Sequence, residues 1–164
     1  MSELTARAAW SAFLLDRRVN REFYERVAED KFDFRMVETK SRRSDSPRES
    51  LAHQIRVQRE YMRGIETGRL EFGALKAVEV ELRELPKLEL LALLDQAGKE
   101  LEQMVCDPGI EEKRIEAPWS DIPLTARELI GFLQMHEVLH TGWNLAVMDH
   151  LEMERFPALR ELWG

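Results

Sequence analysis

Two histidines, His136 and His140, stand four residues apart in a segment with helical periodicity. On an α-helix, residues i and i+4 lie above one another on one face, so both imidazole rings can reach one metal ion. We expect this face to point toward the core, where an unpaired imidazole is costly. The spacing therefore favours a metal site over two hydrogen-bonded core histidines. The same face also carries apolar residues: Leu129, Leu133, Trp143 and Val147.

The composition is typical of one helix-rich domain that spans residues 1–164. Of these residues 44% are hydrophobic and 34% charged, with only 8 Gly and 6 Pro. A chain of this length is long enough to bury a sizeable core. The net charge of −7 argues against a nucleic-acid partner. No segment is apolar over the length of a membrane span, and no signal peptide is evident. We therefore expect a cytoplasmic protein without a membrane partner.

The prolines mark out four long helices. All six lie between or at the edges of periodic segments, as in a helical bundle. The helices are predicted at about residues 5–29, 47–66, 86–105 and 126–150. The second and fourth begin with capping boxes, Ser46 with Glu49 and Thr125 with Glu128. We interpret residues 30–46 as a loop that is a candidate to cross the length of the bundle, residues 67–85 as a connector with some helix, and residues 156–163 as a last turn or short helix.

Four residues outside the histidine pair are candidates for the site or its pocket. His53 lies in the second turn of the second helix and is a candidate third ligand. Arg17 interrupts the apolar stripe of the first helix, so it either extends along its aliphatic stem to the surface or projects into a central pocket. Tyr24 belongs to the same stripe. Trp119 is held between two prolines and either covers the pocket or closes an end of the bundle.

Two known metal motifs match only in part. Residues 136–140 have the HExxH pattern of zinc proteases, in which Glu137 would be the general base. The metzincin extension is absent, because Trp143 and Ala146 occupy its Gly and His positions. A ferritin-like di-iron bundle needs two Glu-x-x-His pairs, and this chain has only the pair that ends at His140.

The remaining interpretation is a three-histidine site that takes one ligand from the second helix and two from the fourth. Three neutral imidazoles, from His53, His136 and His140, leave a position open for water or substrate, as in catalytic zinc sites. Glu137 would then orient an imidazole or face solvent.

Three stretches in this order resemble the DinB-like family of four-helix bundles: residues 46–55, residues 117–119 and residues 136–142. The resemblance implies an all-α bundle with up-down-down-up topology and a long crossover connection. It also implies a homodimer and one divalent transition metal, zinc or nickel, bound by His53, His136 and His140.

Members of this family with known chemistry include bacillithiol transferases and mycothiol-dependent maleylpyruvate isomerase. The resemblance thus implies a metal-dependent enzyme that transfers a group to or from a low-molecular-weight thiol. After the last ligand the family usually has Arg-Gly-Gln, whereas this chain has residues 141–143, Thr-Gly-Trp. An indole in place of an amide changes the size and polarity of the pocket, which puts any substrate inherited from the family in doubt.

Two alternatives remain open. The first is a hydrolase that uses metal-bound water, with Glu137 or Glu60 as the base. The second is a non-catalytic bundle in which the metal only joins two helices. In each case we expect the cavity at the metal to be lined by Arg17, Tyr24, Trp119 and Trp143.

Overall fold

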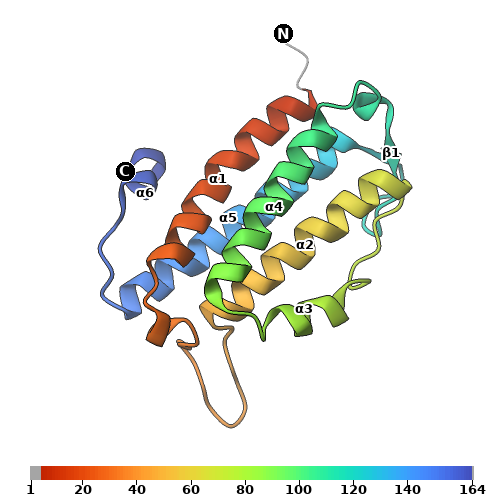
Figure 1. The fold of residues 1–164 in the computed structure, drawn as a ribbon. Coiled ribbons are helices and arrows are strands. Elements are labelled where there is room, and N and C mark those ends of the chain that lie inside the picture. The colour runs from red at the N-terminus through yellow and green to blue at the C-terminus, as the bar shows by residue number, and fades with distance from the viewer. Residues whose placement is uncertain (1–4, 164) are drawn as a thin grey trace.

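The computed structural model describes residues 5–163. Four long helices form a bundle: α1 (Ala6–Arg26), α2 (Pro47–Thr67), α4 (Lys87–Val105) and α5 (Ala126–His150) (Figure 1). Both α1 and α2 pack against α4 and α5, so α4 and α5 occupy opposite corners of the bundle. The prediction of an all-α four-helix bundle is confirmed.

Hydrogen bonds between the helices show the direction of each helix. Helices α1 and α5 run in the same direction, because residues later in α1 contact residues later in α5. Helix α2 runs opposite to α5, and α4 runs opposite to α1, which gives the predicted up-down-down-up order. The contacts that fix these directions are Asp16–Gln134 and Asn20–Thr141 for α1 and α5, Ser50–His140 and His53–His136 for α2 and α5, and Arg21–Asp95 and Val27–Lys87 for α1 and α4.

The crossing connection follows α2 and not α1. Because α2 and α4 are parallel and consecutive, residues 68–86 must return along the bundle, and they include the short helix α3 (Lys76–Leu82), which packs against α2. Residues 27–46 return at the same end instead, through the 3-10 turn η1 (Glu29–Lys31) and an extended loop at the bottom of Figure 1. The expectation that residues 30–46 cross the bundle was therefore wrong, since α1 and α2 are antiparallel and the connection between them starts and ends at the same end of the bundle.

The other end of the bundle is closed by the connection between α4 and α5. It contains the 3-10 turn η2 (Ile110–Glu112) and the strands β1 (Arg114–Ile115) and β2 (Leu124–Thr125), which pair antiparallel. After α5 the chain turns back, and α6 (Pro157–Trp163) packs against α1. None of the described helices is both long and apolar enough to cross a membrane.

Local signals set the starts of α2 and α5. Ser46 and Glu49 form the predicted capping box of α2, and Thr125 and Glu128 form that of α5.

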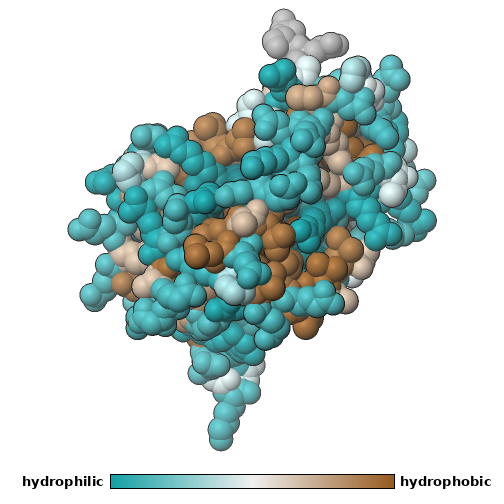
Figure 2. All heavy atoms as spheres, in the orientation of Figure 1, coloured by the Kyte–Doolittle hydropathy of each residue, from teal (hydrophilic) through white to brown (hydrophobic). Residues whose placement is uncertain are grey.

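The face of the molecule in Figure 2 is largely covered by hydrophilic side chains, with apolar side chains gathered near its centre. The amphipathic helices place their apolar residues in two core clusters, and each cluster contains residues of all four long helices, so both clusters hold α2 and α5 in the same bundle.

Glu49 makes the stability of the fold sensitive to acid. Burial alone would raise the pKa of Glu49, but hydrogen bonds from Arg35 and from the backbone N–H of Ser46, with the charge of Arg43, lower that pKa to about 2. The unfolded chain then binds a proton at this carboxyl more readily than the folded chain does. The stabilisation is therefore complete above the unfolded pKa of 4.5 and is lost as the pH falls toward 2.

We expect the free energy of unfolding to fall with pH below 4.5, and Glu49→Gln to make this part of the profile shallower. Urea unfolding followed by circular dichroism at a series of acid pH values measures the slope. Glu102→Gln, at an exposed position of α4, is the matched control and should keep the wild-type slope. Equal slopes in all three proteins would contradict the role given to Glu49.

Candidate metal centre

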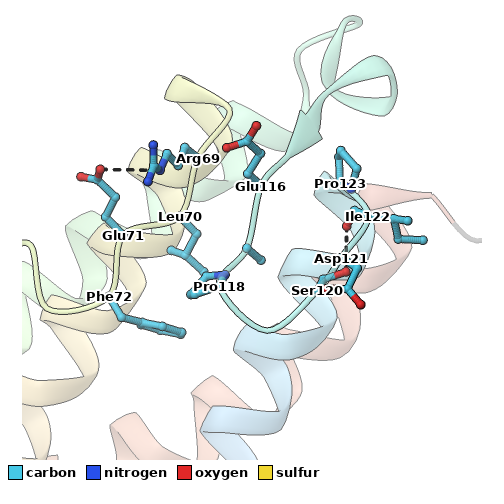
Figure 3. Close-up of a pocket in the computed structure, with 11 residues that line it drawn as sticks. Arg69, Leu70, Glu71, Phe72, Glu116, Pro118, Ser120, Asp121, Ile122 and Pro123 are labelled. Atoms are coloured by element: carbon cyan, nitrogen blue, oxygen red, sulfur yellow. Dashed lines mark hydrogen bonds and ion pairs between the residues drawn. The ribbon is translucent and has the colours of Figure 1, made fainter.

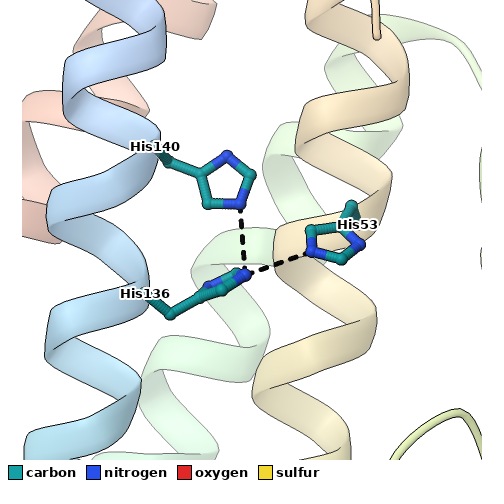
Figure 4. Close-up of side chains that lie close together, drawn as sticks. All are labelled: His53, His136 and His140. Atoms are coloured by element: carbon teal, nitrogen blue, oxygen red, sulfur yellow. Dashed lines mark hydrogen bonds between the residues drawn. The ribbon is translucent and has the colours of Figure 1, made fainter.

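Three imidazoles converge between α2 and α5 (Figure 4). The Nε2 atom of His136 lies 3.1 Å from Nε2 of His53 and 3.2 Å from Nε2 of His140. Bonds of about 2.0–2.1 Å to one ion place neighbouring nitrogens about 2.8–3.0 Å apart in octahedral geometry and about 3.3–3.4 Å apart in tetrahedral geometry. Within residues 5–163 this is the only group of three or more His, Cys, Asp or Glu side chains close enough to bind one ion.

Burial keeps two of these rings neutral. It lowers the pKa of His136 to about 4, and the charge of His53 adds to the effect. Burial, together with the charges of His136 and His53, lowers the pKa of His140 to about 2. A neutral imidazole has a free lone pair on one nitrogen, which is the form that binds a metal. At neutral pH both rings of α5 are thus available as ligands.

A hydrogen-bond chain orients His140. Its Nδ1 atom lies 2.9 Å from the hydroxyl oxygen of Ser50, which lies 2.8 Å from the hydroxyl oxygen of Tyr24. The Tyr24 hydroxyl in turn accepts a hydrogen bond from Gln54. When the proton of His140 is on Nδ1 and is donated to Ser50, the lone pair of Nε2 faces the other two rings.

Tyr24 does not lie where the sequence analysis expected it. It is fully buried and does not line the cavity beside the histidines, because its hydroxyl group contacts Ser50, which lies between Tyr24 and His140. Burial also raises the pKa of Tyr24 above its usual range, so the hydroxyl stays protonated. The sequence carries a signal for Ser50 only in hindsight: it lies three residues before His53 and so close to the same face of α2.

A carboxylate on α3 contacts His53. Glu79 Oε2 lies 3.3 Å from His53 Nδ1 and accepts a hydrogen bond of 2.9 Å from Arg56 Nε. Arg56 Nη2 also lies 3.0 Å from His53 Nδ1, so two tautomers of His53 compete. The tautomer that donates from Nδ1 to Glu79 leaves Nε2 free for a metal. Helix α3 therefore contributes to the site, which its sequence did not indicate.

Glu60 is bound on the opposite side of Arg56. Its carboxylate accepts a hydrogen bond of 2.6 Å from Arg56 Nη1 and one of 2.9 Å from the backbone N–H of Leu75, and Glu60 is 2% exposed. It does not line the cavity at the histidines. The contacts of Glu60 therefore fix the start of α3 against α2 and do not place it as a base.

Arg17 and Glu137 form an ion pair inside the bundle. Arg17 donates to both carboxylate oxygens of Glu137, over 3.1 Å from Nε and 2.7 Å from Nη2, and Asn20 donates to the same group over 2.9 Å. Glu137 is 0% exposed. Neither residue lines the cavity. Arg17 therefore neither extends to the surface nor projects into a pocket, which were the two expectations. It extends into the core, because a buried carboxylate requires a positive partner.

The same ion pair shifts the buried face of α5. The middle of the buried face is formed by Glu137, Thr141 and Asn144. The side chains of His136 and His140 lie at the margin of this face, toward α2, and are only partly buried. The histidines were expected in the middle of the buried stripe. Their actual position leaves them accessible from outside the bundle.

A cavity of about 300 Å³ opens at the three imidazoles. Trp143 lines it, as the sequence suggested, on the α5 side of the site. Leu139 adds an apolar wall and Asp45 a carboxylate, and the sequence analysis missed both. Leu139 could have been found from its place one residue before His140, whereas Asp45 lies on a loop whose path is set by tertiary contacts.

Trp119 lies elsewhere, among the rings of Tyr61, Phe72 and Phe132. It stacks on Phe72 with ring centroids 5.0 Å apart, so it packs against the bundle and does not line the cavity at the three histidines.

Its neighbours in the chain border a larger hollow of about 640 Å³ (Figure 3). The acidic side chains there, Glu71, Glu116 and Asp121, point apart from one another in Figure 3. They form no group of close donors, so the histidine cluster remains the candidate site.

Fold and site together define a four-helix bundle with a three-histidine cluster that could hold a metal ion. No protein-family model matches the chain, and no curated protein matches its sequence. Its fold is similar to that of a crystal structure of a DinB-like protein, YjoA, from Bacillus subtilis. That match has a TM-score of 0.55 and 21% identity and covers 91% of this chain and 94% of the other.

A crystal structure of an uncharacterised protein from Clostridium difficile 630 shares the fold as well. It has a TM-score of 0.65 and 12% identity, and the match covers 92% of this chain and 98% of the other. These similarities confirm the resemblance to the DinB-like family at the level of the fold.

The hydrogen bond from Ser50 to His140 gives a prediction for metal affinity. Ser50→Ala removes the group that fixes the tautomer of His140, and loss of such a partner typically costs about 10- to 100-fold in metal affinity. Competition with a chelator of known affinity measures the change. Ser11→Ala, an exposed hydroxyl on α1, should have no effect. An unchanged affinity in Ser50→Ala would show that His140 is oriented by other contacts.

Proposed function

We propose that His53, His136 and His140 bind one divalent transition metal ion, zinc or nickel. The observation that supports this proposal is the convergence of three Nε2 atoms at 3.1 and 3.2 Å at an open cavity. Imidazole nitrogens suit both metals.

We further propose that the protein is an enzyme that transfers a group to or from a low-molecular-weight thiol. A divalent ion bound here would lower the pKa of a thiol or a water molecule that enters the cavity. No fourth His, Cys, Asp or Glu joins the three ligands in the part of the chain that the structure describes, so the protein leaves room for such a group. The apolar walls of Leu139 and Trp143 suit the apolar part of an acceptor.

The positions of the carboxylates favour thiol transfer over hydrolysis. A thiol that is ionised by a metal needs no separate base, whereas attack by water is usually assisted by one. The two bases considered for a hydrolase, Glu137 and Glu60, are buried in ion pairs with arginines and do not line the cavity. The hydrolase alternative therefore depends on Asp45, which does line it.

The net charge and the thiol chemistry bear on the substrate class and the compartment that we propose. A small-molecule substrate suits the net charge of −7 better than a nucleic acid does. Low-molecular-weight thiols are kept reduced in the cytoplasm, and this is the compartment that we propose for the protein.

The test uses the cobalt-substituted protein in a Cys106→Ser background, because Cys106 is exposed and would itself react with electrophiles. Addition of a small thiol should produce a sulfur-to-metal charge-transfer band. The zinc- or nickel-loaded protein should consume an electrophilic acceptor such as chlorodinitrobenzene only when the thiol is present. Asp45→Asn should retain this activity, and His140→Ala should lose it.

The alternatives predict other outcomes. Turnover of ester substrates without thiol, abolished by Asp45→Asn, would support the hydrolase. The absence of both the charge-transfer band and any turnover would support a bundle in which the metal is structural.

A further inference from the structure

A second cavity, of about 670 Å³, lies where the loop of residues 27–46, the end of α3 and the start of α4 meet, at the bottom of Figure 1. Four of the residues that line it are arginines: Arg35, Arg43, Arg48 and Arg83. The chain as a whole has a net charge of −7, so this wall differs in charge from the rest of the protein. Guanidinium groups match carboxylate and phosphate groups through paired N–H donors.

One carboxylate, Glu49, is shared by three of these guanidinium groups. It accepts hydrogen bonds from Arg35 and from Arg43, the latter over 2.8 Å to Oε1, and Arg83 Nη1 lies 3.9 Å from the same oxygen. The side chains of Arg43 and Arg83 are still 58% and 37% exposed. A single small anion can therefore contact both of them from solvent.

Arg83 has more donors than the protein satisfies. Its Nε atom is buried and has no hydrogen-bond partner among the residues that the structure describes. An N–H group that is withdrawn from water without an acceptor raises the free energy of the folded protein. An acceptor brought by a ligand would reorient this guanidinium at little cost.

The other acids at the cavity do not cancel its positive charge. Asp33 is paired with Arg48 through two hydrogen bonds, of 2.7 and 3.1 Å, and so neutralises only that arginine. Glu84 is exposed and can turn toward solvent.

The start of α4 adds positive potential to the same cavity. Leu85 and Pro86 line it, and Pro86, the N-cap residue, makes no side-chain hydrogen bond to the first turn of α4. The first turn of a helix has free N–H groups and a partial positive charge, both of which favour an anion. Two independent features, the arginines and this helix end, thus point to the same class of ligand.

We propose that this arginine pocket, lined by Arg35, Arg43, Arg48 and Arg83, binds an oxyanion, namely a carboxylate or a phosphate group. Its volume of about 670 Å³ admits an organic molecule that carries such a group as well as an inorganic ion. The pocket is separate from the proposed metal centre, because none of its lining residues lines the cavity at the histidines.

Arg83 connects the two sites. Its Nη2 group donates to one carboxylate oxygen of Glu79, and the other oxygen lies 3.3 Å from His53 Nδ1. An anion that attracts Arg83 leaves Glu79 with less compensating charge, so Glu79 becomes a stronger acceptor for an N–H at His53 Nδ1. The occupied pocket therefore favours the His53 tautomer with a free Nε2, which in the proposed function is the form that binds the metal.

Isothermal titration calorimetry on the full-length protein tests the pocket with inorganic phosphate, glucose 6-phosphate and citrate as probes. Saturable binding is expected both with the metal present and after its removal by chelation and dialysis. Equal affinities for phosphate and glucose 6-phosphate would assign the pocket to the inorganic ion. Tighter binding of glucose 6-phosphate or citrate would assign it to an organic anion.

Arg43→Gln and Arg83→Gln should each weaken binding by about 10-fold or more, because each removes a charged donor. Arg63→Gln removes the same charge from an exposed position of α2 and is the matched control, which should keep the wild-type affinity. Circular dichroism shows whether each variant is folded. Arg43 is exposed and its one ion pair is with Glu49, so Arg43→Gln tests the pocket even if Arg83→Gln unfolds.

No binding of any probe at tens of millimolar, or equal losses in Arg43→Gln and Arg63→Gln, would overturn the proposal. Binding only to the metal-loaded protein would place the anion at the metal and overturn it as well, so failure of the pocket can be told apart from failure of the metal site. The link to His53 has its own readout in the metal-free protein. Saturation with the tightest probe should shift the ring ¹⁵N resonances of His53 toward the Nδ1–H tautomer, and unchanged resonances would overturn the link.

Discussion

Arg17→Met is expected to lower the free energy of unfolding by about 3–5 kcal/mol, because it leaves the Glu137 carboxylate buried without its ion-pair partner. Glu137 is 0% exposed and would retain only the hydrogen bond from Asn20. Methionine keeps most of the volume of the arginine stem, so the loss reports the charge more than a cavity. Urea unfolding at neutral pH measures it.

Two further variants serve as controls for the effect of the buried charge. Arg18→Met, one residue along, removes a surface pair with Glu161 at 3.4 Å and should cost less than about 1 kcal/mol. Arg17→Met combined with Glu137→Leu removes both buried charges and should recover most of the stability. If Arg17→Met costs no more than Arg18→Met, the carboxylate is not desolvated as described.

His136→Ala is expected to reduce the metal content of the purified protein from about one ion per chain to a small fraction of that, because two imidazoles bind an ion far more weakly than three. His136 is the central one of the three proposed ligands, with Nε2 atoms of His53 and His140 at 3.1 and 3.2 Å. His150→Ala is the matched control: this histidine is on the same helix, is exposed, and lies within hydrogen-bond distance of the carbonyl oxygen of Ala146, outside the three-histidine cluster. Elemental analysis after dialysis measures both.

The fold should survive the loss of metal. Apolar side chains of all four long helices form the core, and the histidines lie at its margin. Chelation should therefore lower the melting temperature by mass action and leave the helical circular dichroism spectrum intact. Complete unfolding on chelation would mean that the metal, and not the core, holds α2 against α5.

The parts of the fold that sequence predicted well are those with local causes. The starts of α2 and α5 follow from side chains that bond to backbone groups three residues away, at Ser46 and Thr125. The histidine spacing on α5 is local as well. His53 was a reasonable candidate for a third ligand only because two other histidines already stood at ligand spacing.

The parts that sequence missed depend on contacts between distant segments. The HExxH string suggested a base at Glu137, but Arg17, which lies 120 residues away in the chain, draws that carboxylate into the core. Tyr24 was expected in the pocket and instead reaches the site through Ser50. Periodicity counts an ionised residue as outward-facing, so it cannot foresee a buried pair whose two members are on different helices.

The most direct test of the central claim is anomalous diffraction at a metal absorption edge, on crystals of the protein with its metal bound. The account predicts one peak about 2.0–2.1 Å from the Nε2 atoms of His53, His136 and His140, with every remaining ligand supplied by solvent or a small molecule. No peak at the three imidazoles, or a peak whose coordination is closed by a fourth protein side chain, would contradict it.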